Sequence, residues 1–375
     1  MWRPREKVYW PHSMIPLPLE MNAVILAGGK GTRLRPLTLH TPKPIVPILT
    51  RPFLALQIDL LKKTGIEEIV LSLSYQPRRI EEIFGDGSDL GVRIHYTLEP
   101  EPLGTAGAVK NAEALLSDRT VVFNGDVLSD LDLTSVLRFH EDVGAKATIV
   151  LTIVTNPSAY GLVETDDLGR VRRFLEKPSY DEITCDTINA GVYILEHELM
   201  DYIPTGSNYS FERGFFPHLL QEGVPFYAYV HRGYWIDIGT PEKYLKVHRD
   251  ILSGLLPFQG FHPNAGGTYV DPEATVEAGS RLTGPAFIGA GSVVKSRAVV
   301  EPYAVVGPNC RIEGGATVAD SVLWANVRIG EEARVDGALL GRSAHIGHHA
   351  IVGRGVVLGD KSVITDYSRI SSKQD

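Results

Sequence analysis

A six-residue repeat in the C-terminal part of the chain restricts its possible folds more than any other feature. Aliphatic residues recur every six positions, often with a Gly directly after them and a small residue four positions on. The uninterrupted run is Val270, Val276, Leu282, Ile288, Val294, Val300, Val306, Ile312, Val318 and Trp324. After one-residue slips it continues through Ile329, Val335, Leu340, Ile346, Val352, Leu358 and Ile364. An α-helix cannot produce this period, which is typical of a parallel β-helix whose repeated residues stack inward.

Residues 21 to about 252 follow another pattern, in which apolar strands alternate with amphipathic helices. We predict strands at 23–26, 68–73, 93–96, 120–124, 148–155, 191–195 and 226–230. We predict helices at 53–64, 78–84, 106–116, 133–141, 211–222 and 241–252. This alternation indicates an α/β domain with a mainly parallel sheet and helices on both faces. In such sheets, ligands bind outside the carboxyl ends of the strands.

Length and composition divide the chain further. A chain of 375 residues is long for one core and suggests two domains. Residues 253–269 contain Pro257, Pro263 and a Gly266-Gly267 pair, so we assign them to a linker, and 270–368 to the β-helix. Residues 1–20 hold four prolines and two tryptophans but no apolar segment of a signal peptide. We predict that they are a disordered extension.

Charge and cysteine usage bear on partners and location. The net charge is −8 and there is no long basic run, so we expect no nucleic-acid partner. No apolar stretch approaches the length of a membrane span, so we expect no membrane association. Cys185 and Cys310 lie far apart without metal-ligand spacing. This usage fits a reducing cytoplasm rather than a disulfide framework.

The strongest functional signal follows the first predicted strand. The apolar residues 23–26 run directly into a loop with Gly28, Gly29 and Gly31. Glycines let backbone N–H groups close around a phosphate. Arg33 then supplies a fork of donors, and Lys43 supplies a point charge between two prolines. The segment therefore indicates a site for a phosphorylated ligand.

The loop matches neither of the two common glycine-rich phosphate motifs. A Walker loop requires Ser or Thr after its Gly-Lys pair, but Gly29-Lys30 is followed by Gly31. A dinucleotide fingerprint requires Gly or Ala where this chain has Leu34. The ATPase and dehydrogenase interpretations therefore lose their main support.

Residues 26–34 (Leu-Ala-Gly-Gly-Lys-Gly-Thr-Arg-Leu), with Pro42-Lys43-Pro44, resemble the signature of the sugar-1-phosphate nucleotidylyltransferases. Among these, the chain is most similar to the mannose-1-phosphate guanylyltransferases, over roughly residues 21–365. The resemblance implies a Rossmann-like nucleotidyltransferase domain followed by a left-handed β-helix. It also implies that a nucleoside triphosphate and a sugar 1-phosphate give an NDP-sugar and pyrophosphate, with GTP and mannose 1-phosphate as the expected substrates.

Three alternatives stay open. UTP, dTTP or ATP could be used with glucose 1-phosphate. The chain could be a non-catalytic regulatory subunit, although such a subunit is expected to lack a residue of the phosphate-binding loop or a metal ligand. The β-helix could add an acyltransferase activity, for which His345, His348 and His349 are candidates. With about five coils expected, we interpret these histidines as corner residues and the β-helix as an assembly domain that makes the protein a homo-oligomer.

The resemblance also assigns residues to roles. Arg33 and Lys43 would be catalytic, and Asp126 and Asp237 would bind Mg²⁺. The nucleotide would be bound by Leu26, Ala27, Gly28, Gly29, Gly31, Thr32, Gly104, Asn124 and Gly125. The sugar phosphate would be bound by Glu176, Lys177, Asn189 and Gly191.

Overall fold

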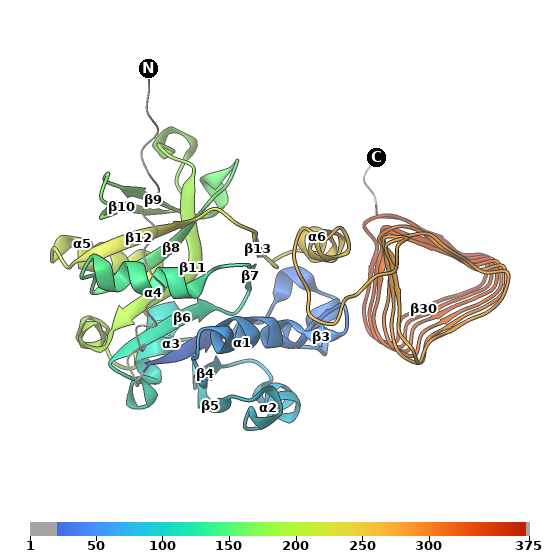
Figure 1. Ribbon diagram of the computed structural model, residues 1–375, viewed down its shortest axis with the longest axis horizontal. Helices are drawn as coiled ribbons and strands as arrows, with labels where there is room; N and C mark the ends of the chain where they lie inside the picture. The colour runs from blue at the N-terminus through green and yellow to red at the C-terminus, as the bar shows by residue number, and fades with distance from the viewer. Residues whose placement is uncertain (1–20, 373–375) are drawn as a thin grey trace, which may run out of the picture.

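A computed structural model describes residues 21–372, which form an α/β domain and a β-helix on either side of helix α6 (Figure 1). The prediction of disorder for residues 1–20 lies outside the described residues. No helix within 21–372 is long and apolar enough to cross a membrane.

The α/β domain is built on a nine-stranded mixed sheet. Its strands are β1 (Met21–Leu26), β4 (Glu68–Leu73), β5 (Arg93–Leu98), β6 (Arg119–Asn124), β8 (Ala147–Ile153), β9 (Gly161–Thr165), β10 (Val171–Glu176), β11 (Thr187–Glu196) and β12 (Phe226–His231). The main order is β10-β9-β11-β6-β1-β4-β5, with β8 beside β11 and β12 beside β8. The antiparallel pairs are gathered around β9 and β11. Each predicted strand is present, and the mixed sheet is confirmed.

The helices are α1 (Phe53–Lys63), α2 (Pro77–Phe84), α3 (Gly104–Asn111), α4 (Leu133–Asp142), α5 (Phe216–Gln221) and α6 (Pro241–Leu252). The helix predicted at 211–222 divides into a π-helical turn, Phe211–Phe215, and α5. Pro217 lies at the junction and lacks the N–H that a continuous helix would need. Strands β9 and β10 were not among the predicted strands. Four short strands with little periodic pattern were not predicted either: β2 (Pro47–Ile48), β3 (Arg51–Pro52), β7 (Val127–Ser129) and β13 (Trp235–Asp237).

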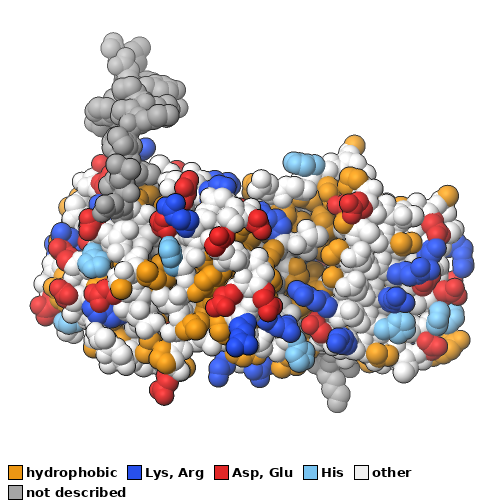
Figure 2. Space-filling model, turned by 90° about the horizontal axis from the view of Figure 1, so that it is seen from below, with side chains coloured by type: hydrophobic (Ala, Val, Ile, Leu, Met, Phe, Trp, Pro, Cys, Tyr) orange, Lys and Arg blue, Asp and Glu red, His pale blue; other side chains and the backbone are white. Residues whose placement is uncertain are grey.

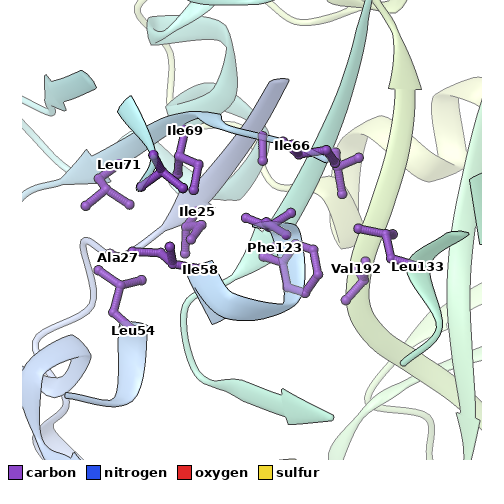
Figure 3. Close-up of a cluster of buried hydrophobic side chains, with 14 of the residues drawn as sticks. Ile25, Ala27, Leu54, Ile58, Ile66, Ile69, Leu71, Phe123, Leu133 and Val192 are labelled. Atoms are coloured by element: carbon purple, nitrogen blue, oxygen red, sulfur yellow. The ribbon is translucent and has the colours of Figure 1, made fainter. Parts of the chain in front are cut away.

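Strand β1 lies at the centre of the core and is buried on both faces. Successive side chains of a strand point to opposite faces of the sheet. Ile25 therefore packs with Leu54 and Ile58 of α1 on one face (Figure 3), whereas Val24 packs with α3 on the other. This double burial accounts for the unbroken apolar run of the first predicted strand.

The C-terminal unit is a β-helix of three parallel six-stranded sheets, seen down its axis as a triangle in Figure 1. One sheet contains β14 (Thr268–Val270), β17 (Ala286–Ile288), β20 (Val305–Val306), β23 (Val322–Leu323), β26 (Leu339–Leu340) and β29 (Val357–Leu358). The second contains β15 (Thr275–Val276), β18 (Val293–Val294), β21 (Arg311–Ile312), β24 (Arg328–Ile329), β27 (His345–Ile346) and β30 (Val363–Ile364). The third contains β16 (Arg281–Leu282), β19 (Val299–Val300), β22 (Thr317–Ala319), β25 (Arg334–Asp336), β28 (Ile351–Val352) and β31 (Arg369–Ile370). Six strands per sheet correspond to six coils, more than the five we expected.

The prediction that Trp324 points into the β-helix is wrong. Leu323 takes the inward position, opposite Val306 and Leu340 of the neighbouring coils. The corner between β22 and β23 is one residue shorter than those before it, so the slip precedes Leu323 rather than following Trp324. Trp324 consequently points outward and packs in the cluster formed with α6.

The three outer faces of the β-helix differ in polarity. The β14–β29 sheet presents Phe287, Val305, Val322 and Leu339, which are buried against α6 and the α/β domain. The second sheet instead presents Arg311, Arg328 and His345 at its outward positions. The two units therefore share a hydrophobic interface, while side chains of both charge signs are interspersed over the face shown in Figure 2.

Candidate active site

A cavity of about 590 Å³ opens at the carboxyl ends of β1 and β6. Every residue predicted to bind the nucleotide lines it: Leu26, Ala27, Gly28, Gly29, Gly31, Thr32, Gly104, Asn124 and Gly125. Arg33, Lys43 and Asp126 line it as well. The fold thus gathers these side chains around one space, although their individual roles stay predictions.

The glycine-rich loop is bonded to Ser74, which follows strand β4. The hydroxyl of Ser74 donates to the carbonyl oxygen of Gly28 at 2.6 Å. A Cβ on Gly28 would lie 2.9 Å from both Ser74 Oγ and Glu99 Oε1, so no larger residue fits there without displacing them. Within residues 21–372, the N–H groups of Gly28, Gly29 and Gly31 donate to no protein acceptor. They are therefore available to an anionic ligand.

The register of β1 and β6 sets the distance between the two loops of the site. Leu26 pairs with Asn124, and the N–H of Gly125 donates to the carbonyl oxygen of Leu26 at 3.0 Å. A Cβ on Gly125 would lie 2.4 Å from that oxygen. Because Gly125 permits this approach, Asp126 emerges directly beside the glycine-rich loop.

Lys43 and Asp126 form an ion pair with 3.0 Å between Nζ and Oδ2. Lys43 lies in a 3-10 turn, Lys43–Ile45, between Pro42 and Pro44, and only 8% of it is exposed. The prolines restrict the backbone on both sides of the lysine. The ammonium group is thereby held over the carboxylate at the end of β6.

Asp237 approaches Asp126 through strand pairing. It lies on β13, opposite Val127 of β7, and the N–H of the next residue, Ile238, donates to the carbonyl oxygen of Asp126 at 2.8 Å. Two carboxylates more than a hundred residues apart thus lie on neighbouring strands. The sequence alone gave no physical reason for this proximity.

Two residues that we did not predict hold the Asp237 side chain. The Tyr160 hydroxyl donates to Asp237 Oδ1 at 3.0 Å, and Lys243 forms an ion pair with the same oxygen. Lys243 Nζ also donates to the Tyr160 hydroxyl at 2.7 Å. Burial raises the pKa of Tyr160, so it remains a neutral donor. Burial lowers the pKa of Lys243, but the bonds to Asp237 and Tyr160 outweigh it and raise the pKa overall.

Asp126 and Asp237 are the two predicted magnesium ligands. Mg²⁺ is usually held in proteins by one or two carboxylates, with phosphate oxygens and water completing its coordination. Among the described residues, no cluster of three or more His, Cys, Asp or Glu side chains could hold a metal. Asp126 lines the cavity, whereas Asp237 does not, and its Oδ1 is bonded to Tyr160 and Lys243. Magnesium binding by this pair stays a prediction.

The Arg33 side chain depends on a glycine that we did not single out. A Cβ on Gly239 would lie 2.9 to 3.0 Å from atoms of the Arg33 guanidinium. Gly239 lines the cavity two residues after Asp237. The turn after β13 thus leaves the space that the guanidinium occupies.

Glu99 was also missed. It lies at the cavity, directly after the end of β5, and its Oε2 accepts from the N–H of Leu103 at 3.0 Å. Because Glu99 also lies next to Gly28, it connects the glycine-rich loop with the turn that precedes Gly104. A polar residue just beyond a predicted parallel strand is a signal that could have identified it.

The four residues predicted for the sugar phosphate are not among the residues that line this cavity. Asn189 donates to the Tyr193 hydroxyl at 2.8 Å and accepts from the N–H of Gly191 at 2.8 Å. Both partners of its side-chain amide thus lie on its own strand, β11. The N–H of Lys177 donates to the carbonyl oxygen of Tyr160 at 2.9 Å, which places this turn beside the Asp237 group. Burial, and then repulsion from Glu212, raise the pKa of Glu176. Sugar-phosphate binding by these residues stays a prediction.

The three C-terminal histidines lie on the outer surface of the β-helix. His345, His348 and His349 are exposed. His348 Nδ1 accepts from the N–H of Glu331 at 3.2 Å, and the ring of His349 stacks on Tyr367 at 4.9 Å. His348 and His349 lie in a corner as predicted, whereas the prediction is wrong for His345, which lies on strand β27.

Two family profiles match the chain, one for each unit. Residues 22–254 match a profile described as "Nucleotidyl transferase", and residues 265–370 match "EIF2B subunit epsilon LbH domain". The chain belongs to the nucleotidyl transferase family. As a nucleotidyltransferase with a C-terminal left-handed β-helix, it confirms the fold and the enzyme class that the signature implied.

Several curated members of the family are similar over most of the chain. "Mannose-1-phosphate guanylyltransferase" of Mycobacterium tuberculosis is 42% identical over 305 residues, covering 81% of each chain. "UTP--glucose-1-phosphate uridylyltransferase" of Synechocystis is 36% identical over 343 residues, covering 86% of this chain and 88% of the relative. The crystal structure of HddC from Yersinia pseudotuberculosis is 34% identical, with a TM-score of 0.53, and covers 60% of this chain and 97% of its own.

Proposed function

We propose that this nucleotidyltransferase transfers a guanylyl group from GTP to mannose 1-phosphate, which yields GDP-mannose and pyrophosphate. The observation that carries the proposal is the single cavity that gathers the glycine-rich loop, Arg33, Lys43 and Asp126. The choice of substrates is supported by the relative from Mycobacterium tuberculosis, whose name specifies this reaction.

The chemistry requires no nucleophile from the protein. An oxygen of the sugar phosphate attacks the α-phosphorus of the nucleotide, the bond to the bridging oxygen breaks, and pyrophosphate leaves with that oxygen. The free N–H groups of Gly28, Gly29 and Gly31 bind the phosphates. Arg33 and Lys43 hold the reacting groups in line and stabilise the charge that develops on the α-phosphate.

Mg²⁺ is part of the proposal. When bound by Asp126 and Asp237, it supplies positive charge that neutralises phosphate oxygens. Lys43 now pairs with Asp126, and Lys243 with Asp237. Both lysines thereby compensate the negative charge of the two partly exposed aspartates.

A second substrate pair has specific support. The Synechocystis relative, at 36% identity, is named for UTP and glucose 1-phosphate. The cradle and the two aspartates suit any nucleoside triphosphate because they address phosphates rather than the base. The preference for base and sugar therefore depends on the residues that contact those groups. dTTP or ATP would bind to the same phosphate-binding residues.

The regulatory-subunit alternative is disfavoured by the intact machinery. The cradle glycines, Arg33, Lys43 and Asp126 all line the cavity, and Asp237 lies on the strand beside Asp126. A subunit without activity would be expected to have lost at least one of these groups.

The proposal is tested by pyrophosphate release in Mg²⁺, with GTP, UTP, dTTP and ATP each supplied with mannose 1-phosphate or glucose 1-phosphate. We expect the GTP and mannose 1-phosphate pair to dominate, and Asp126→Ala and Arg33→Ala to lower its rate at least about 100-fold. Dominance of another pair would correct the substrate and keep the mechanism. A folded protein that releases no pyrophosphate with any pair would favour the regulatory-subunit alternative.

We also propose that the enzyme is a cytoplasmic homo-oligomer assembled through its β-helix. The location is supported by Cys185 and Cys310, both free thiols. Assembly is supported by the two end coils, whose outer strands lack a neighbour on one side within the described chain. Sedimentation velocity would measure the oligomeric state.

A further inference from the structure

The segment that carries Lys43 packs against α6, in the same buried cluster as the apolar face of the β-helix. We call residues 43–49 the Lys43 segment; it comprises the turn at Lys43–Ile45, strand β2 and Leu49. Its side chains Val46, Ile48 and Leu49 are buried in one cluster with Tyr244 of α6 and Trp324 of the β-helix. One side of the active site is therefore built on the interface between the two units.

A chain of two hydrogen bonds runs from the β-helix to this segment. The indole Nε1–H of Trp324 donates to the Tyr244 hydroxyl at 2.9 Å. The Tyr244 hydroxyl in turn donates to the carbonyl oxygen of Pro47, four residues from Lys43. Tyr244 is fully buried and Trp324 is 2% exposed, so water does not compete for these bonds.

A second contact from α6 holds the end of the segment. The N–H of Leu49 donates to His248 Nε2 at 3.1 Å, while His248 Nδ1 donates to the carbonyl oxygen of Tyr244 at 2.8 Å. Leu49 has a positive φ of 52°, which is uncommon for a residue other than glycine. A conformation of this kind persists only where surrounding contacts determine it.

The apolar part of the interface reaches the other site residues as well. Leu34 follows Arg33, Leu128 lies two residues after Asp126, and Ile236 and Ile238 flank Asp237; all four are buried in the same cluster as the β-helix face. The β-helix also approaches the loop after Arg33, where a Cβ on Gly359 would lie 3.2 Å from Pro36.

We propose that Tyr244 and Trp324 are positioning residues for Lys43, so that the β-helix takes part in nucleotidyl transfer by holding the Lys43 segment against the cavity. This inference rests on the catalytic role proposed for Lys43. The two side chains touch no substrate; they act through the Pro47 carbonyl and the short, proline-bounded backbone between it and Lys43.

The test compares Tyr244→Phe and Trp324→Phe with Tyr269→Phe. Tyr269 packs at the same interface, but its hydroxyl contacts only Asp271 at 3.5 Å, so its loss leaves the Lys43 segment untouched. For Tyr244→Phe we expect kcat to fall about ten-fold while KM for the nucleotide changes less than about two-fold. Trp324→Phe should lower kcat about three-fold, and Tyr269→Phe should stay within about two-fold of the wild type.

A second measurement reports on Lys43 itself. The rate of Lys43 acetylation by acetic anhydride, followed by mass spectrometry, should rise about five-fold in Tyr244→Phe, because the released lysine side chain is more accessible to the reagent. The neutral amine form attacks the anhydride, and acetate leaves. Exposed Lys62 serves as the internal control. Should Tyr244→Phe fail to fold, Trp324→Phe decides by the same two readouts.

The outcomes separate this inference from the proposed function. An unchanged kcat in Tyr244→Phe would overturn the positioning role, while Lys43→Ala still tests the role of the lysine independently. A lowered kcat with unchanged Lys43 acetylation would also overturn it, because the tyrosine would then act elsewhere. Full activity in Lys43→Ala would remove the role of Lys43 and the inference together.

Discussion

Glycines around the active site differ in what lies opposite their missing Cβ. At Gly239 the neighbour is the end of the flexible Arg33 side chain, whereas at Gly125 it is the backbone carbonyl oxygen of Leu26. A flexible side chain can move away, but a central strand cannot. Substitutions at the two sites should therefore separate an effect on catalysis from an effect on folding.

We predict that Gly239→Ala displaces the Arg33 guanidinium and lowers kcat/KM about 30-fold, with little change in the melting temperature. The added methyl group would lie 2.9 Å from a guanidinium nitrogen. Steady-state kinetics and thermal unfolding of the same sample check both parts. Wild-type kcat/KM would show that Arg33 is not needed in its present position.

Gly125→Ala is the matched contrast. Its methyl group would lie 2.4 Å from the Leu26 carbonyl oxygen, so β1 and β6 must separate. We expect the free energy of unfolding to fall by about 2 kcal/mol, because overpacking in a core typically costs 1–3 kcal/mol. Urea titration measures it, and unchanged stability would contradict the rigid register that we assign to this strand pair.

At the scale of elements, α6 connects the catalytic and β-helical units. Its bounds were predicted from the sequence and are confirmed: Thr240 caps the first turn by accepting from the N–H of Lys243, and Pro241 follows at the first position. The helix is buried on several sides through Tyr244, Val247, His248 and Ile251. Helix α6 therefore buries more apolar side chains between the two units than a helix with one exposed face would.

Buried His248 should make stability depend on pH. Burial lowers the pKa of His248 to about 4, although its hydrogen bonds to the backbone of Tyr244 and Pro47 oppose this shift. In the unfolded chain the pKa is about 6.5, so below that value the unfolded state takes up a proton that the folded state resists. The contribution is complete above pH 6.5 and declines as the pH falls toward 4, by up to about 3 kcal/mol.

Urea titrations of the wild type and of His248→Gln at several pH values between 7.5 and 4.5 isolate this effect. The variant should be less stable at pH 7.5, and its deficit should shrink in acid because other titrating groups cancel in the difference. A deficit that is constant across this range would show that His248 titrates normally in the folded protein.

At the scale of the whole molecule, the β-helix covers an apolar side of the catalytic domain. Phe287, Val305, Val322 and Leu339 pack there, and Arg249 of α6 pairs with Asp320 beside them, with Arg354 bonded to the same carboxylate at 2.8 Å. The apolar contacts provide most of the adhesion, because partly exposed ion pairs contribute little.

We predict that a chain ending at residue 254 loses solubility as well as activity. Removing the β-helix would expose the buried cluster around Tyr244, and exposed apolar patches of this kind lead to aggregation. Size-exclusion chromatography of the truncated and full-length chains measures this. A monodisperse fragment with full activity would show that the catalytic domain is independent of the β-helix.

Elements with strong periodic patterns could be predicted from the residues alone. The six-residue repeat specified the β-helix because each inward aliphatic residue must stack on the next coil, and no other regular structure has that period. The buried strands, α6 and the glycine-rich loop were equally recognisable, because burial on both faces, capping and φ freedom each restrict residue type locally.

Features that depend on short strands or on distant pairings could be recognised only in the folded molecule. The three-residue strands β7 and β13 carry no period, yet their pairing brings Asp237 beside Asp126. Tyr160 and Lys243 meet at Asp237 from separate elements. A corner shortened by one residue turned Trp324 outward, toward Tyr244. Local sequence cannot encode such contacts, because they exist only once distant backbone segments have been brought together by the core that both help to form.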